Sequence, residues 1–197
     1  LRKIQDIKNS VKGKCPNVYL LHGEFSDEEM NELYNHPKVK LMVSLTKGEG
    51  FGRPLLEFTQ TKKPILTTGW SGHTDFLKPD MSILLPGTLG DMHPSARNNW
   101  FVEGAKWFDV DTMSLGKALK DTHKKYKSFI PKAREQAKYS KDNFSFDKMK
   151  TKLDEIFTAN IPDFPKQVKL ELPKLSSTGE SKELKLPKLE LPKLSKV

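Results

Sequence analysis

Two glutamates bracket the stretch of the sequence that has the clearest potential for chemistry. Glu49 and Glu57 are separated by seven residues, and the segment 48–54 contains three glycines and a proline. Carboxylates accept hydrogen bonds from hydroxyl groups, which sugars and ribose carry in large number. Glycines allow the backbone to approach a ligand closely. The residue types and their spacing therefore predict a site for a hydroxyl-rich ligand.

Pro54 extends this prediction to an anionic ligand. Because proline at the first position of a helix wastes no hydrogen bond, we expect a helix to begin near Pro54 and to include Glu57. The free amides of a helix start carry partial positive charge and bind phosphate. A diphosphate would fit over the glycine turn, where Glu49 and Glu57 reach it from different directions. A structural interpretation stays open, in which the glutamate only favours the helix dipole and Phe51 plugs the core.

The pattern of apolar segments predicts the elements that hold this site. Short apolar runs alternate with amphipathic stretches, as in the strand and helix units of a parallel sheet. Ser26 and Glu29 form the sequence signature of a capping box, which marks a helix start. The expected strands are 18–21, 39–44, 65–68 and 82–85, and a loop or hairpin is expected at 86–110. The expected helices are 1–12, 26–36, one from Pro54, one from Asp111, one after Pro131 and one at 145–157.

We expect an α/β fold with a Rossmann-like parallel sheet flanked by helices, in one domain over residues 1–160. The helices after Asp111 should pack on the sheet. Residues 161–197 differ in composition, and the sequence Leu-Glu-Leu-Pro-Lys-Leu occurs there at 170–175 and at 189–194. Proline every few residues forbids a helix, and few large apolar groups are available to offset the entropy of ordering. This tail is predicted to be extended or disordered.

The formal charge of +9 raises a nucleic-acid hypothesis, because clustered Lys and Arg release counterions from a phosphate backbone. Residues 161–197 hold eight Lys against five acidic residues, so that +6 of the +9 remains over residues 1–160. Basic and acidic residues are interleaved there on the predicted helices, which is typical of a solvated helix face. Nucleic acid is therefore not expected as a partner, whereas a positive balance suits a nucleotide diphosphate.

Other features bound the class of protein. No run of about 18 apolar residues is present, and the amino terminus lacks the apolar segment of a secretory signal. The single cysteine, Cys15, supports neither an internal disulfide nor a zinc cluster. The five histidines are scattered, so no metal site is predicted. We expect a soluble cytoplasmic protein without a membrane span.

The stretch 47–57 resembles the E-x7-E signature of group 1 glycosyltransferases, in which Gly-Phe-Gly-x-Pro lies between the two glutamates. The resemblance covers about residues 16–158. It includes residues 67–75, where Asp75 stands at a position usually held by glutamate, and residues 107–111 with the helices after them. It implies a GT-B fold, in which two Rossmann-like domains face each other across a cleft. The matching residues belong to the second of these domains.

The resemblance also implies roles for individual residues of a nucleotide-sugar site. Glu57 would bind the ribose hydroxyls, and Glu49, the expected catalytic residue, would lie near the hydroxyls of the transferred sugar. The backbone of Gly50, Phe51 and Gly52 would pass over the sugar and the diphosphate. The further residues expected at the donor site are Thr46, Arg53, Gly72 and His73.

Alternatives exist for several of these residues. Thr46 is also consistent with a purely structural residue at a strand end. Group 1 enzymes usually neutralise the diphosphate with an arginine and a lysine after the first strand of this domain, and neither is recognisable here. Arg53 and Lys47 are candidate substitutes, or else solvent-exposed charges. His73 is interpreted as a loop residue lining the cleft, with a general base as the alternative.

Together these features predict a retaining, hexosyltransferase-like glycosyltransferase. It would hold the diphosphate at the Pro54 helix start while an acceptor hydroxyl attacks on the same face. The nucleotide sugar is the substrate, no separate cofactor is expected, and an amino-terminal acceptor-binding domain is an expected partner. The sequence defines neither the sugar, nor the base, nor the acceptor. The alternatives are a non-catalytic nucleotide- or glycan-binding module and a scaffold whose tail docks on a partner.

Overall fold

The computed structural model describes residues 2–96, 101 and 103–162. Its helices are α1 (Arg2–Ser10), α2 (Asp27–Asn35), α3 (Arg53–Thr59), α4 (Thr112–Lys124), α5 (Tyr126–Phe144) and α6 (Phe146–Asn160), with the short 3-10 helices η1 (Gly72–Asp75) and η2 (Pro94–Ala96). Its strands are β1 (Met42–Ser44), β2 (Ile65–Thr68), β3 (Ile83–Leu85), β4 (Gly87–Asp91) and β5 (Lys106–Val110). The tail predicted for residues 161–197 lies outside the described residues, except for its first two positions.

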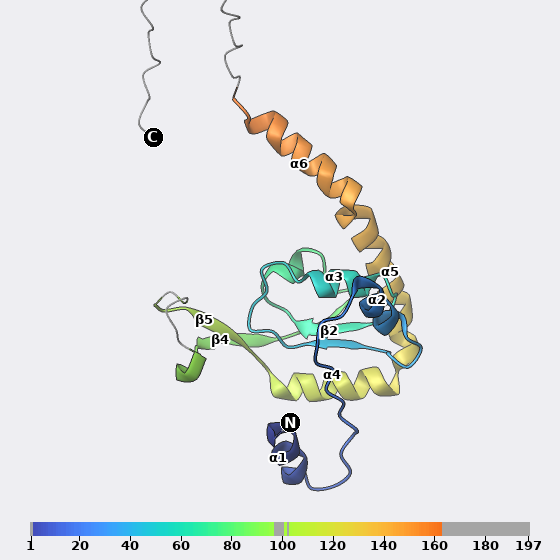
Figure 1. Ribbon diagram of the computed structural model, residues 1–197, viewed down its shortest axis with the longest axis vertical. Coiled ribbons are helices and arrows are strands. Elements are labelled where there is room, and N and C mark those ends of the chain that lie inside the picture. The colour runs from blue at the N-terminus through green and yellow to red at the C-terminus, as the bar shows by residue number, and fades with distance from the viewer. Residues whose placement is uncertain (1, 97–100, 102, 163–197) are drawn as a thin grey trace, which may run out of the picture. The chain divides into compact units, whose positions relative to one another are not determined.

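Strands β1, β2 and β3 form one parallel sheet, in that order. Met42 of β1 pairs with Ile65 of β2, and Leu66 of β2 pairs with Ile83 of β3. Helix α3 lies on one face of this sheet and α4 on the other, and α5 contacts both helices (Figure 1). An α/β fold with a parallel sheet flanked by helices is therefore confirmed.

Strand β2 is the centre of the parallel sheet, and all four of its residues are buried. A parallel strand covered by helices on both faces needs no alternation of apolar and polar residues, which explains its continuous Ile-Leu-Thr-Thr sequence. The bounds of β2 agree with the predicted strand 65–68, whereas β1 and β3 are shorter than the strands predicted at 39–44 and 82–85. The predicted capping box at Ser26 and Glu29 is also confirmed at the start of α2.

Strands β4 and β5 form an antiparallel hairpin, which is one of the two alternatives predicted for residues 86–110. A backbone hydrogen bond joins the hairpin to the turn after β1, because the Phe108 amide donates to the Lys47 carbonyl oxygen at 3.1 Å. At the open end of the hairpin itself, the Asp111 amide donates to the Pro86 carbonyl oxygen at 2.9 Å. The hairpin therefore lies against the turn that follows β1.

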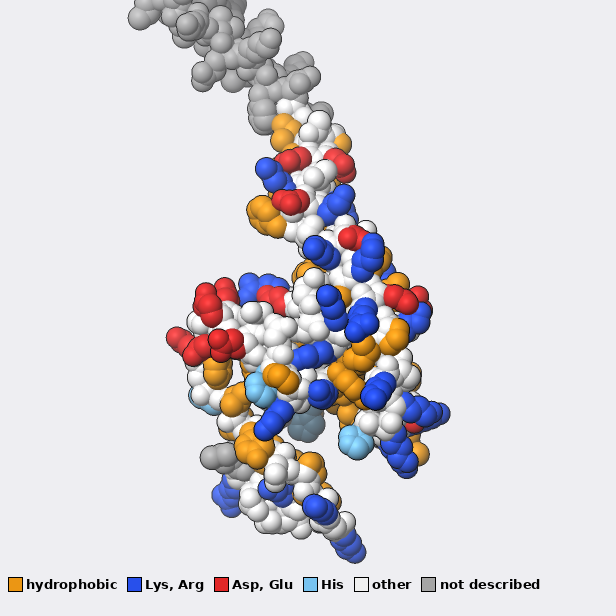
Figure 2. Space-filling model, turned by 90° about the vertical axis from the view of Figure 1, so that its right-hand side faces the viewer, with side chains coloured by type: hydrophobic (Ala, Val, Ile, Leu, Met, Phe, Trp, Pro, Cys, Tyr) orange, Lys and Arg blue, Asp and Glu red, His pale blue; other side chains and the backbone are white. Residues whose placement is uncertain are grey.

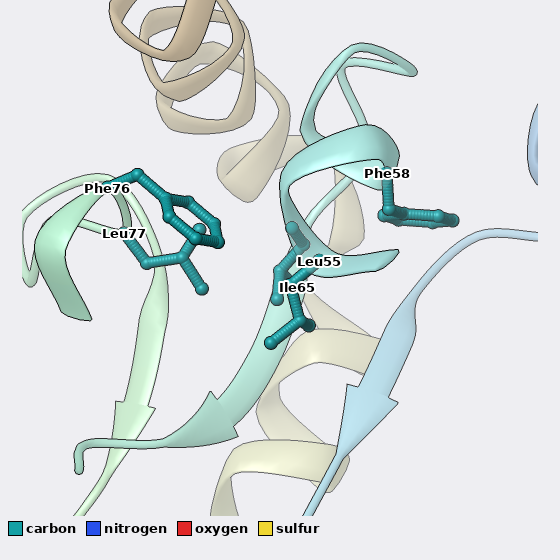
Figure 3. Packing of buried hydrophobic residues seen from close by; sticks show 5 residues of the cluster. All are labelled: Leu55, Phe58, Ile65, Phe76 and Leu77. Atoms are coloured by element: carbon teal, nitrogen blue, oxygen red, sulfur yellow. The ribbon is translucent and has the colours of Figure 1, made fainter. Parts of the chain in front are cut away.

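The main hydrophobic core lies between α3 and the sheet. Figure 3 shows Phe76 and Leu77 pointing toward the core residues of α3 and β2, whereas Phe58 points toward the side of β1. Phe58 meets Tyr34 of α2 edge to face, with ring centroids 5.5 Å apart. The core residues, each at most 3% exposed, are Leu55, Phe58, Ile65, Phe76 and Leu77. This cluster fixes α3, the helix that carries Glu57.

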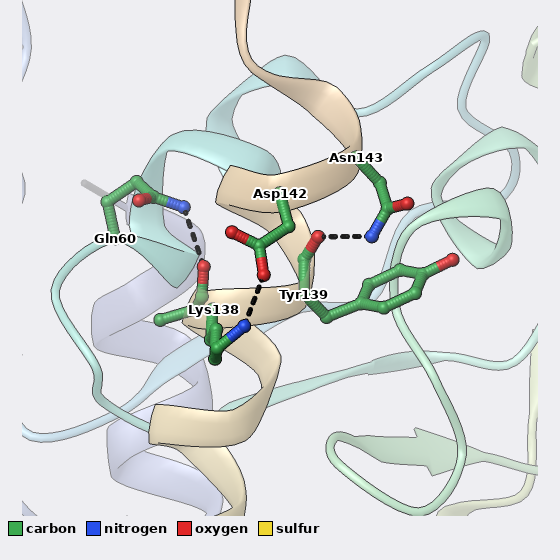
Figure 4. Close-up of polar contacts among 6 residues, drawn as sticks. Gln60, Lys138, Tyr139, Asp142 and Asn143 are labelled. Atoms are coloured by element: carbon green, nitrogen blue, oxygen red, sulfur yellow. Dashed lines mark hydrogen bonds and ion pairs between the residues drawn. The ribbon is translucent and has the colours of Figure 1, made fainter. Parts of the chain in front are cut away.

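A buried polar network joins α5 to the loop between η1 and β3. The Gln136 side chain donates to the Phe76 carbonyl oxygen at 2.7 Å and accepts from the Lys78 amide at 3.0 Å. A buried side-chain amide stabilises a fold only when its polar atoms are hydrogen-bonded. Here both the NH2 group and the carbonyl oxygen of the Gln136 amide are hydrogen-bonded. At the end of α3, Gln60 donates to the Ala137 carbonyl oxygen of α5 (Figure 4). These bonds hold α5 beside the core.

The strand predicted at 18–21 is wrong. Residues 18–21 are in no strand, and they are 51 to 81% exposed. A strand that stands alone leaves its amide and carbonyl groups unpaired, so a short apolar run forms a strand only beside another one. In the described part of the chain, no strand pairs with this run.

The helices after α4 differ from the prediction in two ways. Helix α5 begins at Tyr126 and contains Pro131, instead of beginning after this proline. Proline removes one helical hydrogen bond, but buried residues farther along α5, such as Ala133 and Ala137, keep the helix against the fold. Helix α6 matches the predicted helix 145–157 in position, yet none of its residues is buried. The expectation that this helix packs on the sheet is therefore wrong.

The charged side chains of the described residues are distributed over several elements. On the face shown in Figure 2, Lys and Arg side chains are spread among hydrophobic and uncharged ones, and acidic side chains form a group on the left and also occur elsewhere on this face. None of the described helices is long and apolar enough to cross a membrane.

Helix α4 begins at a carboxylate that should make the fold sensitive to acid. Asp111 is the N-cap, and it accepts hydrogen bonds from the amides of Met113 at 3.2 Å and Ser114 at 3.0 Å. The Ser114 hydroxyl and these amides lower the pKa of Asp111 below its usual value. Because the folded pKa is lowered, this stabilisation is present above the unfolded pKa and is lost as the pH falls through the folded pKa.

We expect Asp111→Asn to keep α4 capped, since asparagine is an equally good N-cap, and to remove this part of the acid dependence. The measurement is the thermal midpoint of both proteins at about pH 7 and about pH 3, on either side of the usual aspartate pKa. The difference between the two midpoints should be smaller in Asp111→Asn. An equal difference in both proteins would contradict the prediction.

Candidate functional site

The glycine turn between β1 and α3 lies against the loop that follows β2. The Ser71 hydroxyl donates to the Glu49 carbonyl oxygen at 2.5 Å, and the Glu49 amide donates to Ser71 Oγ at 2.8 Å. The Gly72 amide donates to the same Glu49 carbonyl oxygen at 3.0 Å. Parallel strands end at one edge of a sheet, which is where α/β proteins bind ligands. Glu49, Gly50 and Gly72, predicted from separate stretches, thus lie together.

This packing requires glycine at position 72 and strains the residue before it. A Cβ atom at Gly72 would lie 2.0 Å from the Gly50 carbonyl oxygen and 2.9 Å from that of Glu49. Ser71 has φ 83° and ψ −170°. This conformation is essentially restricted to glycine, and for other residues it costs about 1–3 kcal/mol. Strain of this kind concentrates at active sites and ligand clamps.

Gly52 and His73 make a second close contact between the same two loops. Gly52 is the N-cap of α3 with φ 85°, and a Cβ atom there would lie 2.9 Å from the Cβ of His73. His73 has no exposed surface, and its Nε2 lies 2.6 Å from the Thr68 carbonyl oxygen. Because a carbonyl only accepts, Nε2 carries a proton. His73 was predicted to line the cleft from a loop, but it lies buried in η1.

The start of α3 has fewer free amides than the sequence suggested. Pro54 has no amide hydrogen, and the amides of Leu55 and Leu56 both bond to the Gly52 carbonyl oxygen, at 3.0 and 3.2 Å. The Phe51 ring packs at 5.2 Å from the ring of Phe76, although Phe51 remains 38% exposed. Its side chain thus contributes to packing, as the structural interpretation proposed, and only its backbone belongs to the turn.

A cavity of about 450 Å³ lies between α2 and α3. Its size falls within the range of about 300–1,000 Å³ that holds small ligands in proteins. Met30, Asn31 and Tyr34 line it from α2, and Arg53 and Glu57 line it from α3. Two of the residues predicted to bind the donor therefore face one cavity.

The charged groups of this cavity influence one another. Arg53 Nε lies 2.9 Å from Glu57 Oε1, and both side chains remain accessible to solvent. Burial, and after it the Glu57 carboxylate, raise the pKa of Tyr34 above its usual value. The cavity thus offers two carboxylates, those of Glu57 and Asp27, with a guanidinium and a phenol. The carboxylates suit the hydroxyl groups of a ligand, and the guanidinium suits a phosphate.

Unpaired polar atoms are found at the carboxyl edge of the sheet. Among the described residues, three buried side-chain atoms have no hydrogen-bond partner: Thr46 Oγ1, Thr68 Oγ1 and His73 Nδ1. Leaving such an atom unpaired costs about 1–3 kcal/mol, so each needs an explanation. All three belong to segments at or after the ends of β1 and β2. Thr46, predicted as a donor-site residue, is one of them.

The predicted site residues therefore form two groups. Glu49, Gly50, Gly52, Gly72 and His73 belong to the packed loops at the sheet edge, whereas Arg53 and Glu57 line the cavity, and Glu49 is not among the residues lining it. Sequence reasoning missed Ser71 and Tyr34. For Ser71 the sequence contains no signal, because nothing in it indicates a positive φ at a serine. For Tyr34 a signal exists, because Tyr34 lies four positions after Met30 on α2, and this spacing places both side chains on one helix face.

Comparison with models of protein families and with curated proteins found no match for this chain. Within the described residues, no three His, Cys, Asp or Glu side chains gather as metal ligands would. The candidate site is therefore supported by its geometry and by its sequence pattern.

Proposed function

We propose that this chain is the nucleotide-sugar-binding domain of a retaining glycosyltransferase, one half of a GT-B enzyme. The observation that carries the proposal is the cavity between α2 and α3, which Arg53 and Glu57 line together. A carboxylate there suits both ribose hydroxyls, and a guanidinium suits a phosphate oxygen. The E-x7-E resemblance, which does not depend on the cavity, assigns the ribose to Glu57 as well.

The proposed role of Glu49 follows from the turn that carries it. Ser71 and Gly72 hold this turn at the carboxyl edge of the sheet, and the exposed Gly50 leaves its backbone accessible to a ligand, whereas Gly52 is buried against His73. The donor diphosphate would lie over the turn, and Glu49 would contact the transferred sugar. The Arg53 guanidinium would stabilise the charge that develops on the leaving diphosphate.

An acceptor-binding domain is part of this proposal. Transfer requires the acceptor hydroxyl and the donor to be held in one cleft, and such orientation is worth about 7–11 kcal/mol of the barrier. The proposed partner domain would form the opposite wall of that cleft. The sugar is transferred with retention at the anomeric carbon, from a donor that is bound through Glu57.

Glu57→Ala is expected to weaken nucleotide binding by about 1.5–3 kcal/mol, the range for hydrogen bonds to a charged group. The measurement is calorimetric titration of UDP, GDP and ADP into the wild type and the variant. Glu135→Ala is a matched control, because Glu135 also forms an exposed ion pair at 2.9 Å, with Lys132 on α5. The control should bind as the wild type does.

Unchanged nucleotide affinity in folded Glu57→Ala would remove the main support for the site. A second assay separates an enzyme from a binding module, namely the release of sugar from the matching nucleotide sugar in the presence of the wild-type chain. Release that depends on Glu49 supports the transferase. Binding without any release, even when an acceptor-binding domain is added, supports the non-catalytic module instead.

A further inference from the structure

One aromatic side chain at the sheet edge has no role in the site described above. Trp70 follows β2 directly after Gly69, and it is 41% exposed. Its ring stacks on that of Phe108, with centroids 6.1 Å apart and an interplanar angle of 5°. Phe108 itself is only 7% exposed. The Trp70 ring is therefore held by a buried neighbour while much of the residue stays open to solvent.

The backbone around Trp70 keeps the ring in this position. The next residue is the strained Ser71, which is fixed by two hydrogen bonds to the backbone of Glu49. On the other side, the Gly69 amide donates to the Leu85 carbonyl oxygen at 2.9 Å. A tryptophan whose only role is packing does not require a backbone that is fixed by hydrogen bonds on both sides. Rigid placement lowers the entropy that a side chain loses on binding, and strained backbone concentrates at ligand sites.

Polar groups border the same segments. Lys47 and Asp109 form an ion pair, and both side chains are about half exposed. Asp109 is the residue after Phe108, and the Lys47 carbonyl oxygen accepts from the Phe108 amide. Glu49 lies two positions after Lys47. Lys47 and Glu49 thus belong to the turn that contacts Phe108 and Ser71, whereas Asp109 lies in β5 and alternates with Phe108.

We propose that Trp70 is a stacking platform for a pyranose ring, so that this edge of the sheet is a sugar subsite distinct from the cavity between α2 and α3. The face of an indole ring is electron-rich and attracts the C–H groups on one face of a pyranose. Glu49, whose backbone is bonded to the residue next to Trp70, offers an acceptor for hydroxyl groups on that side. A flat nucleobase also stacks on indole, but a carboxylate on the neighbouring turn favours a ligand with hydroxyl donors. This inference rests on the proposed function for its place in a sugar-transfer reaction.

The test is saturation-transfer NMR on the full chain with three probes, the methyl α-glycosides of glucose, mannose and galactose. Each is used at about 50 mM, because contacts with a single ring give dissociation constants in the millimolar range. The variants are Trp70→Leu, which keeps an apolar group on Phe108 but removes the aromatic face, and Trp70→Phe, which keeps a ring. Leu119→Ala is the control, because Leu119 is a comparably exposed apolar residue, at 39%, and lies on α4.

We expect saturation of the ring C–H protons of at least one glycoside by the wild type. The signal should fall about tenfold in Trp70→Leu, which corresponds to about 1.4 kcal/mol, and should largely persist in Trp70→Phe and Leu119→Ala. No transfer to any glycoside, or equal transfer to the wild type and Trp70→Leu, overturns the proposal. Trp70-dependent transfer to uridine or adenosine but to no glycoside also overturns it, because the platform would then bind a base.

The same samples keep this inference separable from the proposed function. Nucleotide titration reports on Glu57, and glycoside saturation reports on Trp70. If glycoside binding depends on Trp70 but nucleotide affinity is unchanged in Glu57→Ala, the proposed function is contradicted and the sugar subsite is supported. If nucleotide affinity depends on Glu57 but glycoside binding does not depend on Trp70, only the sugar subsite is contradicted.

Discussion

Phe76→Ala is expected to lower the free energy of unfolding by about 3–5 kcal/mol, the range for truncating a buried phenylalanine. Phe76 has no exposed surface and belongs to the core cluster under α3. Its ring contacts those of Phe51, at 5.2 Å, and Phe144, at 5.9 Å, so the variant would leave a cavity bordered by three elements. Domains are stable by only about 5–15 kcal/mol, so this loss is large.

Urea unfolding of the full chain, followed by circular dichroism, measures this effect. The matched control is Phe146→Ala on α6, where the same side chain is 83% exposed. Substitutions at such surface positions usually change stability by no more than about 0.5 kcal/mol. If both variants lowered stability equally, Phe76 would not be a core residue and the packing of η1 against α3 would be incorrect.

Gly72→Ala is expected to lower stability by about 3 kcal/mol or more, at the upper end of the range for overpacking. The added methyl group would lie 2.0 Å from the carbonyl oxygen of Gly50. That atom is backbone and cannot rotate away as a side chain would. The two loops must therefore separate, which breaks the hydrogen bonds from Gly72 and Ser71 to Glu49. The proposed donor site should be lost with them.

Gly116→Ala provides a control of opposite sign. Gly116 lies within α4, and a Cβ atom there would have no other atom within 4 Å. Alanine in place of glycine inside a helix is favourable by about 0.5–1 kcal/mol. Thermal midpoints of the two variants should therefore shift in opposite directions from the wild type. A Gly72→Ala protein as stable as the wild type would show that the loops are not packed as described.

Local signals in the sequence predicted those parts of the fold that short-range chemistry determines. The capping box at Ser26 starts α2, the proline at position 54 lies at the start of α3, and the apolar run 65–68 is β2. Each depends on residues that are close together in the sequence. Gly72 and Glu49, which were both predicted for the donor site, are hydrogen-bonded to each other, because a parallel sheet brings the turns after its strands to one edge.

The parts that could not be predicted depend on contacts between distant residues. The run 18–21 has the composition of a strand but no neighbour to pair with among the described residues, and composition does not reveal a missing neighbour. The apolar residues of α6 have helical periodicity, yet none of its residues is buried by the described part of the chain. His73 is buried because Gly52 allows a close approach, a contact between two loops that no spacing in the sequence indicates.

Arg53 and Glu57 are each other's counter-ion in the cavity, and this has a thermodynamic consequence for any ligand that enters. An exposed ion pair contributes only about 0–1 kcal/mol of free energy, so exchanging it for bonds to a ligand costs little. The pair nevertheless restrains two long side chains, whose rotamer entropy is then partly lost before the ligand arrives. A ligand that offers hydroxyls to the carboxylate and an anion to the guanidinium gives each of the two side chains a new partner when their ion pair breaks. Binding of the hydroxyl end of the ligand by Glu57 is thereby coupled to binding of its anionic end by Arg53.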